Sequence, residues 1–234
     1  RSQEIGLVVD AASCELAGID VVRRPTGGGA ILHSGDITYC YTSPLDAFYG
    51  NVRDECFSFV AEGVIEALRL LGIDACTSRH RGSRSPDGWC FDREFGVDIE
   101  WHGRKICGSA QRVTGGAVLQ HGTVFLERHA ATVVPYATGG VAPLADPPVN
   151  LEEVVGRPVD FSRAAEAFKR GFAAAHGLVL EEGSLDSGEC REAGLLCAAR
   201  HGAPCAGRGN NEGHVCDIIG QRNSAGDDDE RQRR

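Results

Sequence analysis

The fold is decided by residues 97–126, which read VDIEWHGRKICGSAQRVTGGAVLQHGTVFL. This segment contains three stretches rich in β-branched and apolar residues, at 97–101, 104–112 and 117–126. They are joined by His102-Gly103 and by Thr114-Gly115-Gly116, which are turn sequences. Short turns of this kind connect antiparallel neighbours. The pattern therefore predicts an antiparallel meander of three strands.

A glycine loop and one long helix are predicted upstream of the meander. Apolar residues recur at helical spacing over 51–71, and Gly72 provides a stop. Before this helix we expect a short helix at 11–17 and extended structure at four apolar stretches, which are 5–9, 19–23, 30–33 and 37–41. The basic segment 79–88 ends in Pro86-Asp87-Gly88 and is predicted to be a loop.

The region after the meander predicts a second helix and then a tail. The stretch 141–150 contains three prolines and is expected to be irregular, and Asp160 should cap a helix that ends at His176-Gly177. Past about Gly183 large apolar residues are scarce, which predicts a weakly ordered tail. Meander strands with separate helices indicate the α+β class. We expect a catalytic domain at 1–182, incomplete at its N-terminus, and a tail at 183–234.

Composition restricts the class of protein. The formal net charge of -9 argues against a general nucleic-acid binder, which needs a basic surface to replace counterions on phosphates. No apolar run approaches the roughly 20 residues that cross a bilayer, and the start Arg1-Ser2-Gln3-Glu4 lacks a signal-peptide pattern. We therefore expect a cytoplasmic protein with no membrane partner. Its ten cysteines, without a secretory signal, are expected to be reduced thiols.

The first segment whose residues suit a binding or catalytic role is Arg23-Arg24-Pro25-Thr26-Gly27-Gly28-Gly29-Ala30, followed by His33. Three consecutive glycines let backbone N–H groups approach a carboxylate, a phosphate or an acyl carbonyl closely. A loop that only reverses the chain would contain the same glycines. The glycines alone therefore leave both interpretations open.

The second segment is 103–111, Gly-Arg-Lys-Ile-Cys-Gly-Ser-Ala-Gln, followed by His121-Gly122. On an extended strand Lys105 points to the face opposite Arg104, so one ammonium can enter a pocket while the guanidinium stays outside. The alternative is that both cations solvate the end of a hairpin.

Together the two segments resemble the signature of the lipoate-protein ligase, octanoyltransferase and biotin ligase superfamily. In that superfamily an Arg-Arg-x-Thr-Gly-Gly-Gly loop and a Gly-Arg-Lys-(Ile/Val)-x-Gly-Ser-Ala strand line one acyl pocket. The resemblance is clearest over 19–126, and it implies a biotin/lipoate ligase-like catalytic domain with a central mixed, largely antiparallel sheet and flanking helices. The substrate-binding residues that it implies are Arg24, Thr26, Gly27, Gly28, Gly29, His33, Gly108, Ser109, Ala110, His121 and Gly122.

Cys90 is the candidate nucleophile. The pair Cys90-Phe91 precedes Lys105 by 15 residues, and in the LipM-type octanoyltransferases a Cys-Phe pair with this placement contains the catalytic cysteine. The resemblance thus implies Cys90 and Lys105 as the catalytic residues. An ordinary core cysteine is the alternative at this position.

The chemistry that follows is acyl transfer without ATP or another cofactor. A thiolate that attacks an acyl carrier protein thioester forms another thioester, and a protein lysine then converts it to a stable amide. Lys105 would favour the thiolate and donate a hydrogen bond to the oxyanion. The expected donor is octanoyl-acyl carrier protein, and the expected acceptor is a lipoyl domain or the glycine-cleavage H protein. These partners are acidic in general, so a basic docking surface on the enzyme would suit them. The candidates for it are Arg79, Arg81 and Arg84, and the alternative is that they belong to a solvated loop.

Several alternatives stay open. An ATP-dependent lipoate-protein ligase shares both motifs, but the segment 95–98, Phe-Gly-Val-Asp, lacks the Arg-Asn pair that such ligases often show, which favours transfer. A lipoyl-domain amidotransferase uses the same Cys and Lys roles, and an inactive acyl-binding fragment is a further alternative. Biotin ligases differ in the glycine loop. A zinc site is disfavoured because the spacing of its candidate ligands does not match structural zinc sites; these are Cys190, Cys197, Cys205, Cys216, His201 and His214.

Overall fold

A six-stranded sheet organises the molecule. The computed structural model describes residues 9–19, 21–22, 24–81, 95–127, 148–201 and 216–217. The strands are β1 (Asp36–Pro44), β2 (Cys76–Arg81), β3 (Phe95–Trp101), β4 (Arg104–Thr114), β5 (Ala117–Phe125) and β6 (Cys216–Asp217). Their order in the sheet is β2-β3-β4-β5-β1-β6, and every pairing is antiparallel except the one between β1 and β6. The predicted α+β class and the mixed, largely antiparallel sheet are confirmed.

The predicted meander is present as β3, β4 and β5. Its second turn places Gly115 at φ 60° and Gly116 at φ 79°. Two consecutive positive φ values are typical of the tight turns whose twist matches that of the flanking strands. The turn therefore brings the end of β4 and the start of β5 into register, with Thr114 opposite Ala117.

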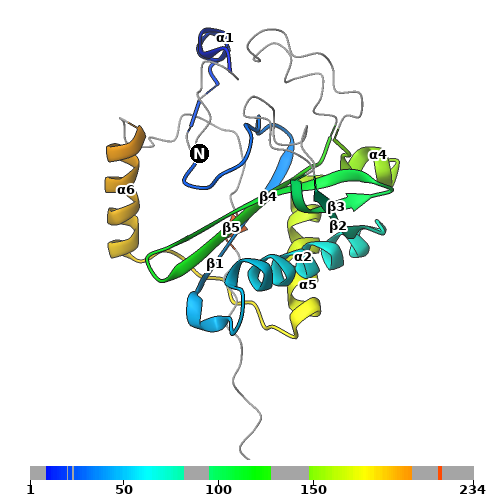
Figure 1. The fold of residues 1–234 in the computed structure, drawn as a ribbon. Coiled ribbons are helices and arrows are strands. Elements are labelled where there is room, and N and C mark those ends of the chain that lie inside the picture. The colour runs from blue at the N-terminus through cyan, green and yellow to red at the C-terminus, as the bar shows by residue number, and fades with distance from the viewer. Residues whose placement is uncertain are drawn as a thin grey trace, which may run out of the picture.

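Two helices cover one face of the sheet. They are α2 (Val52–Leu70) and α5 (Phe161–His176), which pack against each other below the sheet in Figure 1. Asn51 and Asp160 cap them by accepting hydrogen bonds from backbone N–H groups in the first turn, as these residue types do at helix starts. Phe168 and Phe172 project from α5 into the core, where both rings lie against Tyr39 of β1. Both long-helix predictions are confirmed.

The remaining helices are short or peripheral. They are α1 (Ala11–Leu16), the 3-10 turn η2 (Leu45–Ala47), α4 (Leu151–Val155) and α6 (Ser187–His201). In Figure 1 α6 stands apart from the other helices, and its leucines Leu195 and Leu196 are exposed. No helix in the described part of the chain is long and apolar enough to span a membrane.

Several expectations from the sequence are wrong or stay predictions. The predicted strand at 30–33 is wrong, because Ala30 makes only an isolated bridge; four residues beside three glycines make too few ladder hydrogen bonds. Part of the predicted loop at 79–88 is strand β2, which pairs with β3 from Cys76 opposite Glu100 to Arg81 opposite Phe95. Helix α6 lies where no regular element was expected, and the division into a domain and a tail stays a prediction. The predictions for 5–8, 82–88 and 141–147 fall outside the described residues.

Gly171 is predicted to be essential for the contact between α2 and α5. A Cβ at this position would lie 2.6 Å from Cα of Ala67, inside the backbone of the opposite helix. Gly171→Ala should lower the free energy of unfolding by about 1–3 kcal/mol, because overpacking forces backbone shifts. Urea denaturation of the parent and the variant measures the difference. The matched control is Gly194→Ala on α6, where no atom lies within 4 Å of the new Cβ; an equal loss in both variants would contradict the prediction.

Candidate active site

The two faces of the sheet have different surroundings. Tyr39 of β1 is buried and faces α5, so Thr38 on the same strand points to the opposite face. Across the strands Thr38 lies opposite Thr123, which in turn lies opposite Gly108. The next row on this face joins Cys40, His121 and Ala110. We call the side with α2 and α5 the helix face and the side with these two rows the loop face.

The glycine loop is attached to the loop face by side-chain hydrogen bonds. The Arg24 guanidinium donates to the carbonyl of Gly27 at 2.9 Å and to that of Gly29 at 2.8 Å. Arg112 of β4 donates to the carbonyl of Pro25 at 2.8 Å. Thr26 Oγ1 lies 2.6 Å from Nε2 of His121. These contacts hold the glycine loop over β4 and β5.

His121 is a neutral imidazole at the centre of this assembly. Burial, and after it electrostatic repulsion from Arg24 and from His33, lowers the pKa of His121 to about 4. In a neutral ring one nitrogen donates and the other accepts, and the Thr26 hydroxyl can pair with Nε2 in either role. His121 therefore positions the glycine loop without adding a charge to the site.

The lowered pKa of His121 predicts a pH dependence of stability. The unfolded state binds a proton near the ordinary histidine pKa of about 6.5, whereas the folded state does so only near pH 4. The unfolded state thus binds more protons between these values, and stability is lost as pH falls through this window, by on the order of 2 kcal/mol. Urea midpoints of the parent and of His121→Gln, measured from pH 7 to pH 4, should converge. A constant difference over this range would contradict the prediction.

Lys105 is ion-paired beneath the surface of the sheet. Its Nζ lies 2.8 Å from Oδ1 of Asp98, and the exposed fractions of the two side chains are 11% and 6%. Ile99 belongs to the core on the helix face, so its neighbours Asp98 and Glu100 point to the loop face. Lys105 lies directly opposite Glu100, and the register shifts just beyond this pair. The ammonium therefore lies beside two buried carboxyl groups on the loop face.

The predicted separation of Arg104 and Lys105 is confirmed. Arg104 Nη1 lies 2.5 Å from Oε1 of Glu153 on α4, while Lys105 contacts β3. The two neighbouring cations thus have partners on different elements. Only Lys105 is directed to the loop face with the glycine loop and His121.

Two of the predicted substrate-binding residues lie on the helix face. Gly122 is opposite Tyr39, and a Cβ on it would lie 2.6 Å from Cζ of that ring. Ser109 is opposite Gly122 and shares its face. Burial and the nearby Cys107 thiol raise the pKa of Tyr39, so the phenol stays protonated. The side chain of Ser109 and the Cα hydrogens of Gly122 thus face the core, whereas Gly108, Ala110 and His121 face the loop.

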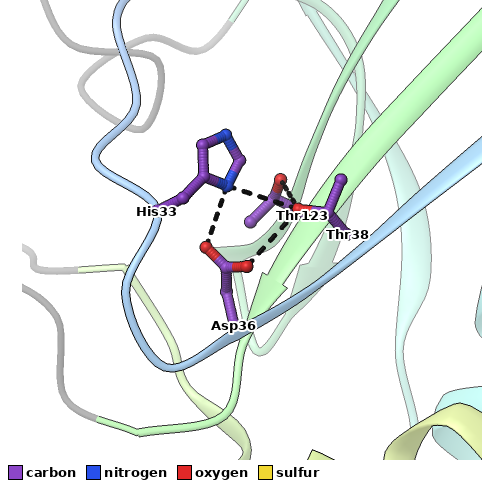
Figure 2. Close-up of polar contacts among 4 residues, drawn as sticks. All are labelled: His33, Asp36, Thr38 and Thr123. Carbon is purple, nitrogen blue, oxygen red and sulfur yellow. Dashed lines mark hydrogen bonds and ion pairs between the residues drawn. The ribbon is translucent and has the colours of Figure 1, made fainter. Parts of the chain in front are cut away.

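A polar network borders the loop face at the start of β1 (Figure 2). Nδ1 of His33 lies 2.9 Å from Oδ2 of Asp36, and Thr38 Oγ1 lies 3.4 Å from the other oxygen of this carboxylate. Thr38 is also 3.3 Å from Nδ1 of His33 and 3.0 Å from Oγ1 of Thr123. Gly35 permits the turn that folds His33 back over Asp36, because its φ is 60°. His33 is thereby anchored to β1 and β5.

Sequence reasoning assigned no role in the site to four residues, which are Asp98, Glu100, Asp36 and Arg112. The signal for the first two was present, because acidic residues at alternate positions of an apolar strand lie on one face, opposite Lys105 across a short turn. Cys90 lies outside the described residues, as do Arg84 and the side chain of Arg81. Arg79 is exposed on the edge strand β2. No group of three or more potential metal ligands occurs among the described side chains.

Comparison with known families assigns the chain. The model for the lipoyl protein ligase A/B catalytic domain matches residues 1–173. The chain belongs to this family. A relative named octanoyltransferase LipM from Symbiobacterium thermophilum is 33% identical over 83% of this chain and 76% of its own length. Another from Kyrpidia tusciae is 32% identical over 84% of this chain and 77% of its own length.

Solved structures share the fold of this lipoyl ligase A/B domain. A T. acidophilum protein with bound lipoic acid superposes with a TM-score of 0.69 at 23% identity, over 84% of this chain and 75% of that one. Lipoate-protein ligase A bound with ATP gives a TM-score of 0.66 at 24% identity, over 81% and 72%. The predicted family is confirmed, and with it the prediction of an acyltransferase-type enzyme.

Proposed function

We propose that this lipoyl ligase A/B domain is an octanoyltransferase of protein lipoylation. In this proposal Cys90 takes an octanoyl group from acyl carrier protein as a thioester, and a lysine of a lipoyl domain or H protein receives it as an amide. The observation that carries the proposal is the Lys105 ammonium on the loop face, 2.8 Å from the buried Asp98 carboxylate, in a chain whose similar relatives are named octanoyltransferases.

Lys105 has the properties that an oxyanion-stabilising donor requires. Its ion pair with Asp98 holds the side chain in place, and a positive charge that is preorganised in this way stabilises a developing oxyanion. The carbonyls of Gly27 and Gly29 are occupied by Arg24, so this side chain fixes the loop conformation. Gly108, which has no side chain, and Ala110, which has a small one, lie on the same face of the sheet. We assign the acyl group to this part of the loop face.

We further propose that the enzyme uses no cofactor, that its donor is an acidic carrier protein, and that it is located in the cytoplasm. Thioester exchange followed by aminolysis needs neither ATP nor a metal, because the donor is already activated. Arg79 projects from the edge strand β2 and offers a positive charge to an acidic carrier protein. We assign the enzyme to the cytoplasm, where reduced thiols persist.

The test is an intact-mass experiment with octanoyl-acyl carrier protein and no ATP. We expect the mass of the enzyme to rise by one octanoyl group, and hydroxylamine should remove it, as expected of a thioester. Addition of a lipoyl domain should then transfer the group to lysine. Labelling of the lipoyl domain that requires ATP and free octanoate or lipoate would instead identify a ligase.

A further inference from the structure

We propose that His33 is the general base that takes the proton from the attacking lysine, and that Asp36 positions it. The inference rests on the proposed octanoyl transfer and assigns a residue to its second half. It is carried by the geometry of the network between His33, Asp36, Thr38 and Thr123 (Figure 2).

The network defines which nitrogen of His33 can accept a proton. A carboxylate can only accept hydrogen bonds, so Nδ1, at 2.9 Å from Asp36, carries the hydrogen. In the neutral ring Nε2 is then the basic nitrogen, which is the arrangement of an imidazole oriented by an acid. Figure 2 shows Nε2 on the side of the ring away from Asp36. Within the described part of the chain nothing is hydrogen-bonded to Nε2.

His33 is also accessible to a protein substrate. Half of its side chain is exposed, at 51%, whereas Asp36 is exposed to only 10%. A buried carboxylate below an exposed imidazole holds the ring in place while leaving it open to an incoming lysine. The charge of His33 acts on His121, which places both rings in one electrostatic environment on the loop face.

The other candidate bases in the described site are already bound to other side chains. Lys105 is held as a cation by Asp98, and His121 uses Nε2 in its hydrogen bond with Thr26. Thr38, which His33 contacts, lies in the same row as Gly108, three residues along β4 from Lys105. At about 3.4 Å per residue, the backbone positions of Lys105 and Gly108 are roughly 10 Å apart along β4. The oxyanion donor and the proposed base are thus separate groups, and both are directed to the loop face.

Aminolysis needs such a base because the amine nitrogen becomes positively charged when it bonds to the acyl carbon and must lose a proton before a neutral amide can form. A lysine side chain is itself protonated at neutral pH, with a pKa of about 10.4. The ammonium first loses one proton to solvent, and the amine nitrogen forms a bond to the acyl carbon of the thioester. The nitrogen becomes positive and acidic, and Nε2 of His33 accepts its second proton. The carbon–sulfur bond breaks, the sulfur leaves as a thiolate, and the imidazolium releases the proton to solvent.

The experiment separates the two halves of the reaction in single-turnover assays of the full chain. The variants are His33→Ala, Asp36→Asn and Asp36→Glu, and the matched control is His102→Asn in the exposed turn between β3 and β4. Acylation by octanoyl-acyl carrier protein should proceed at the parent's rate in His102→Asn and should fall far less than transfer in the His33 and Asp36 variants. Transfer to the lipoyl-domain lysine should slow about 10²–10⁴-fold in His33→Ala, the usual contribution of a general base.

Rescue distinguishes a base from a structural residue. Added imidazole should restore transfer in His33→Ala, and Asp36→Glu should retain more transfer than Asp36→Asn. Hydroxylamine is uncharged near neutral pH and does not need a base to attack. It should therefore cleave the acyl-enzyme of every variant at the same rate.

Two outcomes would overturn the inference while the proposed function stands. One is transfer at the parent's rate in His33→Ala, and the other is an equal loss of acylation and transfer, which would indicate a binding role. If the parent forms no acyl-enzyme, the proposed function fails and the assignment of His33 falls with it.

Discussion

Cys90→Ser is expected to abolish both the octanoyl adduct and the transfer to lysine. A serine hydroxyl is a much weaker nucleophile than a thiolate near neutral pH, so loss of the sulfur should reduce turnover by more than about 10³-fold. The measurement is intact mass after incubation with octanoyl-acyl carrier protein, followed by product analysis on the lipoyl domain.

The matched control for this experiment is Cys76→Ser. Cys76 is an exposed thiol on β2, and its replacement should leave the adduct and the transfer unchanged. Labelling of the lipoyl domain by Cys90→Ser at the parent's rate would remove the covalent route, even if the family assignment stands.

Lys105→Ala is expected to impair both catalysis and stability. Loss of an oxyanion donor typically lowers the rate by about 10²–10³-fold. Removal of the ammonium also breaks its ion pair with the buried Asp98 carboxylate, and breaking a buried ion pair costs about 3–5 kcal/mol. Urea denaturation and single-turnover acylation of the same preparation measure the two effects.

A double variant separates these two effects. Lys105→Met/Asp98→Leu replaces the pair by apolar side chains of similar size, which is often neutral for stability. It should recover most of the lost stability and none of the lost rate. Recovery of acylation along with stability would show that Lys105 is structural.

The elements that could be predicted from the sequence are those whose apolar residues recur with the regular spacing of a helix or a strand. The meander and both long helices have clear turn or capping signals, namely Thr114-Gly115-Gly116, Asn51 and Asp160. Strand alternation also separated Arg104 from Lys105 correctly. These features depend on residues that are close in sequence, where periodicity is informative.

The remaining features depend on long-range contacts that one sequence does not reveal. Segment 76–81 contains charged residues and becomes a strand because β3 offers an edge to pair with. The family motif marked Ser109 and Gly122 as pocket residues, but register places them beside Tyr39 on the helix face. Arg112 reaches the glycine loop across 87 residues of sequence. None of these contacts has a local signal.

The alternation of faces along β4 and β5 has an evolutionary consequence. Positions 108, 110 and 121 lie on the loop face, to which we assign the acyl group, while 107, 109 and 122 lie on the helix face, although the two sets interleave residue by residue. Point substitutions can therefore diversify the accepted acyl chain without eroding the hydrophobic interior. An insertion of a single codon within β4 would exchange the two sets at once, so selection should tolerate divergence in these strands but not changes in their length.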